Sequence, residues 1–252
     1  MDVSKVAVIG AGVMGSGIAQ VLAVAGCEVV CCDVAEEQLE RARRLTADGR
    51  YGLARAVERG KLSAAQAASA GDRLRFSADA DAAVAAADLV VEAVPEDLDL
   101  KVRLFARFDQ LAAEHTILAT NTSGLPVTAM AAATARPAKV IGWHWSSPAP
   151  VMRMAEIVIT PDTGDETVAT VVDLARRCGK NPVVVRDNPA KWGHVGNRIY
   201  AAAVAEARAV VAEGLTDEAG VDQIMTDGWG WPAGPFGMGR GARRGWQDAG
   251  GS

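Results

Sequence analysis

Three glycines near the start of the chain carry the first chemical signal. Gly10, Gly12 and Gly15 fit the pattern G-x-G-x-x-G, between an apolar run at 5–9 and an apolar stretch of helical spacing at 13–25. In such a turn the first glycine permits a sharp bend, the second lets the backbone approach a pyrophosphate, and the third allows close packing of helix and strand. The residues of this predicted phosphate-binding turn are Gly10, Ala11, Gly12, Val13, Met14 and Gly15.

An acid follows the turn at the spacing that a dinucleotide site requires. Asp33 closes a second apolar run at 28–32, 18 residues after Gly15. A carboxylate there accepts hydrogen bonds from the adenosine ribose hydroxyls and repels a 2′-phosphate. Glycines alone also occur in ordinary turns, but strand, helix and acid in register predict that the chain binds NAD in preference to NADP.

Imidazole and thiol groups are few. Histidines occur at positions 115, 144 and 194, so a mechanism that needs an imidazole base has a short list of candidates. The cysteines at 27, 31, 32 and 178 lack both C-x-x-C spacing and nearby histidines, so we expect buried thiols in a reducing compartment and no metal site.

The elements that must position these groups alternate along the chain. Apolar runs predict strands at 5–9, 28–32, 74–76, 88–92, 116–119, 139–143, 155–159 and 182–186. Helical spacing is found at 97–113 and 165–178, and a helix pair is expected as an insertion over about 35–71, with breaks at Gly49 and Gly60. This order predicts an α/β fold with a Rossmann-type, doubly wound, mostly parallel sheet.

The composition changes near residue 187. Helical patterns at 197–213 and 217–226 precede a tail rich in Gly and Trp. We therefore expect an NAD-binding domain at 1–187 and a small, all-helical domain at 188–252.

Composition and charge narrow the class of partner. The 252 residues are 50% hydrophobic, and 26 Lys and Arg stand against 31 Asp and Glu without a block of like charge. A nucleic-acid partner is therefore not expected. No apolar window approaches the ~18 residues of a membrane span, and the first residues lack a signal-peptide pattern, so we expect a cytoplasmic protein without a membrane partner.

Four segments keep a mutual spacing that is typical of one enzyme family. They are GAGVMGSGIAQ at 10–20, LVVEAVPEDLDLK at 89–101, ILATNTSGLP at 117–126 and IGWHWSSPAPVMRMAEIV at 141–158. With them the chain resembles the 3-hydroxyacyl-CoA dehydrogenases, including the short-chain 3-hydroxybutyryl-CoA enzymes, over residues 4 to about 236. The resemblance implies NAD-dependent oxidation of an (S)-3-hydroxyacyl thioester to the 3-oxoacyl thioester.

The resemblance assigns the catalytic pair. It makes His144 the general base for the substrate 3-hydroxyl and Glu156 the carboxylate that orients the imidazole and stabilises its charged form. On the residues alone, His144 is equally well explained as a hydrogen-bonded core histidine, and Glu156 as a solvated acid.

Four further positions follow from the same resemblance. Ser123 matches a serine near the substrate hydroxyl and thioester, and Asn197 matches an asparagine that orients the substrate. Glu96 and Lys101 match positions at the nicotinamide half of the cofactor site. Their simpler explanations are turn chemistry at 121–123, a helix N-cap at Asn197, and solvated charges on a helix.

The chain departs from the family pattern beside the histidine. Trp145, Ser146, Ser147 and Pro148 stand where the family has Phe-Phe-Asn-Pro, and Ser147 takes the place of an asparagine that contacts cofactor and substrate. We expect Ser147 to keep part of that contact and the new residues to reshape the substrate pocket. Ser-Gly replaces Ser-Ser at 123–124, and three residues are added between Pro189 and Gly193.

The C-terminal region is shorter than the family pattern. A small helical remnant cannot cover its own apolar face, so we expect a homodimer formed through the C-terminal helices.

The altered pocket leaves alternatives open for the function. One is a dehydrogenase of an acyl thioester on an acyl carrier protein, or of a free polar hydroxy acid. Basic residues on the inserted helices suit either phosphate-bearing carrier, although a solvated helix face explains them as well. Another is a nicotinamide-binding protein without catalysis.

Overall fold

A computed structural model describes residues 2–248, with side chains through residue 241. Its contacts divide the chain into a larger unit, Met1–Trp192, and a smaller unit, Gly193–Ser252.

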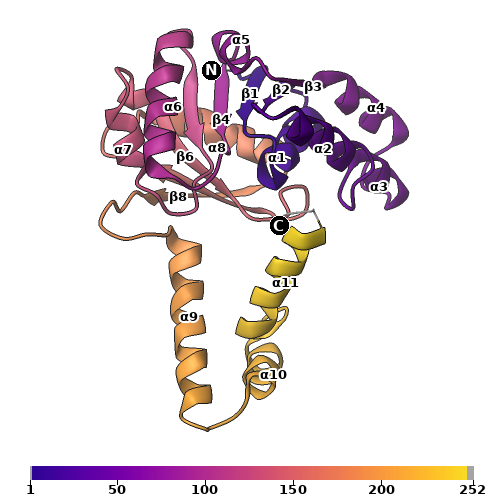
Figure 1. The fold of residues 1–252 in the computed structure, drawn as a ribbon, viewed down its shortest axis with the longest axis vertical. Coiled ribbons are helices and arrows are strands. Elements are labelled where there is room, and N and C mark those ends of the chain that lie inside the picture. The colour runs from indigo at the N-terminus through magenta and orange to yellow at the C-terminus, as the bar shows by residue number, and fades with distance from the viewer. Residues whose placement is uncertain (1, 249–252) are drawn as a thin grey trace. The chain divides into compact units, whose positions relative to one another are not determined.

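A mixed sheet forms the centre of the larger unit (Figure 1). In the described residues its order is β3-β2-β1-β4-β5-β6-β7-β8. The strands are β1 Lys5–Ile9, β2 Glu28–Cys32, β3 Leu74–Ser77, β4 Leu89–Glu92, β5 Ile117–Thr120, β6 Val140–Trp145, β7 Met154–Ile159 and β8 Asn181–Arg186. Neighbours from β3 through β6 pair in parallel, which confirms the Rossmann-type sheet.

The sheet reverses direction once, between β6 and β7. These two strands are antiparallel, and β8 then runs parallel to β7. The connection at 146–153 is shorter than the dozen or more residues that a parallel crossover requires, so the chain must return alongside β6.

Helices cover both faces of the sheet, so its central strands are apolar on both sides. On β1, Val6 and Val8 face the core that includes α1 (Val13–Val24) and α8 (Asp165–Arg177). The intervening Ala7 and Ile9 face the other core. That core is covered by α5 (Ala80–Ala85), α6 (Leu98–Leu111) and α7 (Val127–Ala132). A 3-10 turn, η1 (Pro137–Lys139), precedes β6.

The insertion after β2 contains three helices where the sequence predicted a pair. They are α2 Glu36–Ala47, α3 Leu53–Glu58 and α4 Ala64–Arg73. Gly49 lies in the turn after α2, and Gly60 adopts a φ of +66° after α3, so each glycine follows the end of a short helix. Ser63 then starts α4 with a capping box to Gln66.

The smaller unit is all-helical. It contains α9 Val195–Ala212, α10 Glu218–Trp229 and α11 Gly234–Asp248. The sequence showed no specific helical pattern after residue 226, and contacts of Asp222 in α10 help to hold the Gly-rich segment of α11 in place. Its carboxylate accepts a hydrogen bond from the Phe236 amide (2.8 Å) and pairs with Arg240 (2.7 Å), which ties the first turns of α11 to α10.

Two properties of residues 2–248 limit the kinds of site. None of the helices there has the length and apolar character needed to cross a membrane. The same residues contain no cluster of three His, Cys, Asp or Glu side chains that could hold a metal ion.

Candidate active site

The glycine turn joins β1 to α1 and leaves its backbone open to a ligand. Gly10 has a φ of +104°, and a Cβ there would lie 2.5 Å from the carbonyl oxygen of Ala93. A Cβ on Gly15 would lie 1.7 Å from the Gly10 oxygen, so close packing of helix and strand requires glycine. At Gly12, the N-cap of α1, a Cβ would meet nothing within 4 Å. The turn therefore has the tight bend, the close packing and the open approach that a pyrophosphate needs.

Asp33 is held beside this turn. One carboxylate oxygen accepts a hydrogen bond from the Ala11 amide (2.9 Å), and the other accepts one from the Ala35 amide (3.1 Å). The carboxylate is half-buried at the carboxyl end of β2, where ribose hydroxyls can reach it. Turn and acid together fit NAD, because a 2′-phosphate would meet a fixed negative charge.

A buried ion pair lies at the carboxyl end of β4. Glu92, the last residue of β4, is fully buried, and its Oε1 lies 2.6 Å from Lys101 Nζ. It also accepts hydrogen bonds from the Val94 amide (2.7 Å) and from Thr120 Oγ1 (2.6 Å). Glu92 was not among the site residues predicted from the sequence. The available signal was an acid at the end of an otherwise apolar strand, a pattern that also describes a solvated strand end.

Glu96 extends this network to the loop after β5. Its Oε2 lies 3.4 Å from Lys101 Nζ, and its Oε1 accepts hydrogen bonds from Thr122 Oγ1 (2.6 Å) and the Ser123 amide (2.8 Å). The structure thus brings Glu96 and Lys101, predicted from the segment at 89–101, together with Ser123 from the segment at 117–126. Lys101 is 1% exposed, so it is not the solvated helix charge that was the alternative.

His144 and Glu156 face each other across the antiparallel strands. They are register partners on β6 and β7, and His144 Nδ1 lies 2.7 Å from Glu156 Oε2. Both side chains are nearly buried, with exposed fractions of 8% and 6%. A ring that donates its Nδ1 proton to a carboxylate carries its basic lone pair on Nε2. The pair therefore has the geometry of an oriented imidazole base.

A hydrogen bond joins the residue after β5 to the last residue of β6. Asn121 Oδ1 accepts a hydrogen bond from the Trp145 amide (3.0 Å), next to His144. Asn121 was not among the predicted site residues, because its side-chain contact joins two segments that are distant in the sequence.

Trp145 corrects one expectation about the substrate pocket. Side chains alternate along a strand, and Trp145 packs with Trp143 in the core beneath α1 and α8, on the opposite face from His144. It is 2% exposed, so it does not alter the pocket by lining it. Ser147 is exposed in the loop after β6 and is one of the altered residues available to a ligand.

Asn197 belongs to the smaller unit, in the first turn of α9. The N-cap of that helix is His194, so Asn197 is not the cap that the simpler explanation required. Its proposed part in orienting the substrate stays a prediction.

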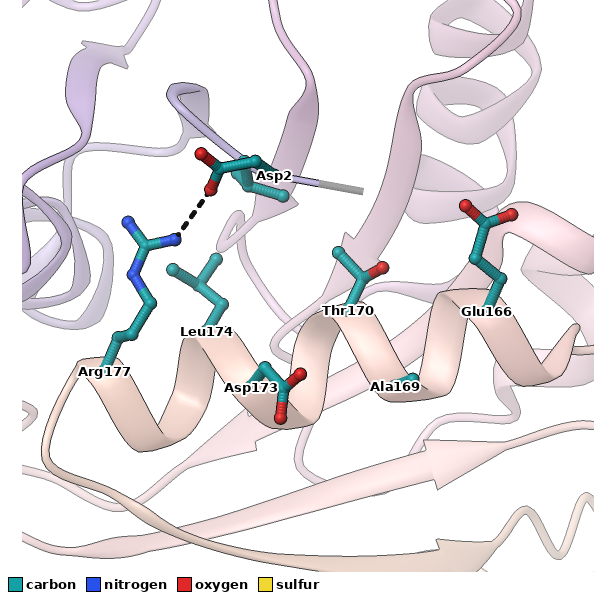
Figure 2. Close-up of a pocket in the computed structure, with 8 residues that line it drawn as sticks. Asp2, Glu166, Ala169, Thr170, Asp173, Leu174 and Arg177 are labelled. Atoms are coloured by element: carbon teal, nitrogen blue, oxygen red, sulfur yellow. Dashed lines mark hydrogen bonds and ion pairs between the residues drawn. The ribbon is translucent and has the colours of Figure 1, made fainter.

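A hollow away from these residues is lined by α8 and by the segment before β1. Figure 2 shows it, with Asp2 paired to Arg177 (3.1 Å) and with Glu166 and Asp173 along the helix. None of the predicted site residues lines this hollow, so we do not assign it to the reaction.

The glycine turn, the acid after β2 and the His144–Glu156 pair all lie at the end of the sheet where the parallel strands have their carboxyl ends. Fold and site together define a nicotinamide-dependent oxidoreductase.

Comparison with known proteins identifies the family. The family model "3-hydroxyacyl-CoA dehydrogenase, NAD binding domain" matches residues 5–188, and the model of the C-terminal domain matches residues 193–244. A probable 3-hydroxybutyryl-CoA dehydrogenase of Bacillus subtilis is 39% identical over 239 residues, which are 94% of this chain and 80% of the relative. The chain belongs to the 3-hydroxyacyl-CoA dehydrogenase family, and the expectation of NAD as cofactor is confirmed.

Solved structures of two enzymes of this family are also similar to this chain. The (S)-3-hydroxybutyryl-CoA dehydrogenase of Ralstonia eutropha has a TM-score of 0.86 and 37% identity, over 93% of this chain and 80% of that one. The 3-hydroxybutyryl-CoA dehydrogenase of Escherichia coli K12 has a TM-score of 0.85 and 38% identity, over 93% of this chain and 48% of that one.

The Glu92–Lys101 pair generates a stability prediction. Lys101→Met leaves a fully buried carboxylate without its cation, so we expect the free energy of unfolding to fall by about 3–5 kcal/mol. Adding Glu92→Gln removes the uncompensated charge and is expected to restore part of that loss. Denaturant unfolding of both variants measures this, with Arg55→Met, which breaks an exposed ion pair to Glu58, as a control that changes little. A double variant no more stable than Lys101→Met would contradict the argument.

Proposed function

We propose that this chain catalyses the reversible, NAD-dependent oxidation of an (S)-3-hydroxyacyl thioester of the 3-hydroxybutyryl-CoA kind to the 3-oxoacyl thioester. The observation that carries the proposal is the buried contact of His144 with Glu156, at the same end of the sheet as the glycine turn. The relatives named as 3-hydroxybutyryl-CoA dehydrogenases support the choice of substrate.

His144 and Glu156 divide the work of alcohol oxidation. His144 Nε2 takes the proton of the 3-hydroxyl as the C3–O bond gains double-bond character and C3 releases its hydrogen with both bonding electrons. NAD, when bound, accepts that hydride. Glu156 holds the ring in orientation through Nδ1 and stabilises the imidazolium that forms in this nearly water-free position. In the reverse direction the imidazolium returns the proton to the 3-oxo oxygen.

The remaining site residues bind and orient. Glu96 and Lys101 form the wall of the nicotinamide half of the site, and Glu96 holds the backbone of Ser123. The Ser123 hydroxyl and the Asn197 amide supply neutral hydrogen bonds to the substrate, and Ser147 contacts cofactor or substrate from the loop after β6.

A second candidate rests on Ser146 and Ser147, which stand where the family carries Phe and Asn. Two hydroxyl side chains in this loop favour a polar acyl group, carried on an acyl carrier protein or used as a free hydroxy acid. The base and its carboxylate would do the same chemistry on such a substrate.

NADH formation by the purified protein tests the choice between these substrates. We expect turnover with NAD and (S)-3-hydroxybutyryl-CoA, little with NADP because of Asp33, and little with free 3-hydroxybutyrate. Turnover with the free acid or with a carrier-protein thioester alone would replace the leading proposal by the second candidate. NADH binding without turnover of any of these substrates would favour a non-catalytic nicotinamide-binding protein.

Substitution of the base tests its role. We expect His144→Ala to lower kcat by about two to four powers of ten while NADH still binds, because the glycine turn and Asp33 are untouched. His115→Ala is the matched control, since His115 is exposed and contacts Asp88 away from the site. Equal activity of His144→Ala and the native protein would show that another group is the base.

We also propose that the chain forms a homodimer through its C-terminal helices. The smaller unit exposes large apolar side chains, which a partner would cover. They are Val195, Ile199, Leu215, Ile224, Trp229 and Met238. Light scattering that finds a monomer would contradict this.

A cytoplasmic location is supported by the thiols. The four cysteines are free and three of them are buried, as is usual for thiols in a reducing compartment. A fluorescent fusion found in another compartment would overturn the assignment.

A further inference from the structure

Lys180 is a buried cation on the far side of the sheet from His144. It lies between α8 and β8, is 6% exposed, and directs its Nζ toward the loop at 146–153 that joins β6 to β7. Burial lowers the pKa of Lys180, an effect that the nearby Cys178 opposes. Burying an amine carries a free-energy cost, so its contacts must compensate for the lost hydration.

The contacts of Lys180 converge on that one loop. Nζ donates hydrogen bonds to the carbonyl oxygens of Ala149 (2.5 Å) and Met152 (2.7 Å). It also lies 4.8 Å from the centre of the Trp145 ring, within the range of a cation–π contact. Lys180 thus contacts both Trp145, the last residue of β6, and the loop that follows it.

The same loop is packed against the cofactor-binding helix. A Cβ on Gly17 of α1 would lie 3.2 Å from both Ala149 Cβ and Pro150 Cδ, so helix and loop approach closely two residues after the predicted phosphate-binding turn ends. The loop therefore meets α1 at one point and Lys180 at another, and it carries Ser147 between the strands of His144 and Glu156.

We propose that Lys180 is a positioning residue for the reaction, which holds the 146–153 loop, and with it the end of the base strand, in the geometry that hydride transfer requires. The inference rests on the proposed function and deepens it. Lys180 itself is not proposed to touch substrate or cofactor. Its effect reaches the site through Trp145 and the loop backbone.

Two substitutions separate positioning from plain structural support. Lys180→Met keeps a long apolar side chain but removes the donors, and Lys180→Gln keeps an NH₂ group that can reach a carbonyl oxygen. We expect Lys180→Met to lower kcat about ten- to a hundredfold at a temperature where it is fully folded, because small misplacements of reacting groups have effects of that size. We expect Lys180→Gln to recover part of the loss, and NADH to bind both variants.

Lys139→Met is the matched control. Lys139 precedes the other end of β6 and pairs with Glu166 (3.6 Å), so its loss should leave kcat unchanged. A kcat of Lys180→Met within about twofold of the native value, or equal losses in the Met and Gln variants, would overturn the proposal.

Amide hydrogen exchange tests the loop without any substrate. The Val151 and Met152 amides donate to the Pro148 carbonyl oxygen, each at 3.0 Å. We expect faster exchange of both amides in Lys180→Met, and partial recovery in Lys180→Gln. If the native protein fails to turn over the thioester, the proposed function fails, and this measurement alone then decides whether Lys180 holds the loop. Unchanged exchange would reject it.

Discussion

The antiparallel pairing of β6 with β7 is the constraint on which the active site depends. It places His144 directly opposite Glu156, with 2.7 Å between ring nitrogen and carboxylate oxygen, in a position that excludes most water. A buried acid and a buried imidazole are each unfavourable alone, and their contact satisfies both. A parallel β7 would require a longer crossover and would remove this register.

The parallel half of the sheet supplies the other requirement, a rigid cofactor edge. Gly10, Asp33 and Glu92 sit at the carboxyl ends of neighbouring strands, and the Lys101 network fixes the loops beyond β4 and β5. Removing Lys101 leaves the buried Glu92 carboxylate without its cation, and the same network joins the loops after β4 and β5 through Glu96 and Ser123. The same end of the sheet therefore carries both the glycine turn and the proposed base.

The sequence predicted the features that rest on local patterns. The glycine turn with Asp33 follows from spacing within one βαβ unit, and His144 with Glu156 follows from a family resemblance that keeps its spacing. Contacts across long separations were not predictable. Lys180 donates to carbonyl oxygens of the 146–153 loop from 28 to 31 residues away, and the buried Glu92 accepts a hydrogen bond from Thr120, 28 residues away. Trp145 was expected at the pocket, but strand alternation turns it toward the opposite core.

A crystal structure with NAD and a 3-oxoacyl thioester bound tests the central claim most directly. We expect the 3-oxo oxygen within about 2.6–3.2 Å of His144 Nε2, with Nδ1 still in contact with Glu156 and C3 facing the nicotinamide. A 3-oxo oxygen held by other groups, with His144 beyond hydrogen-bond reach, would contradict it.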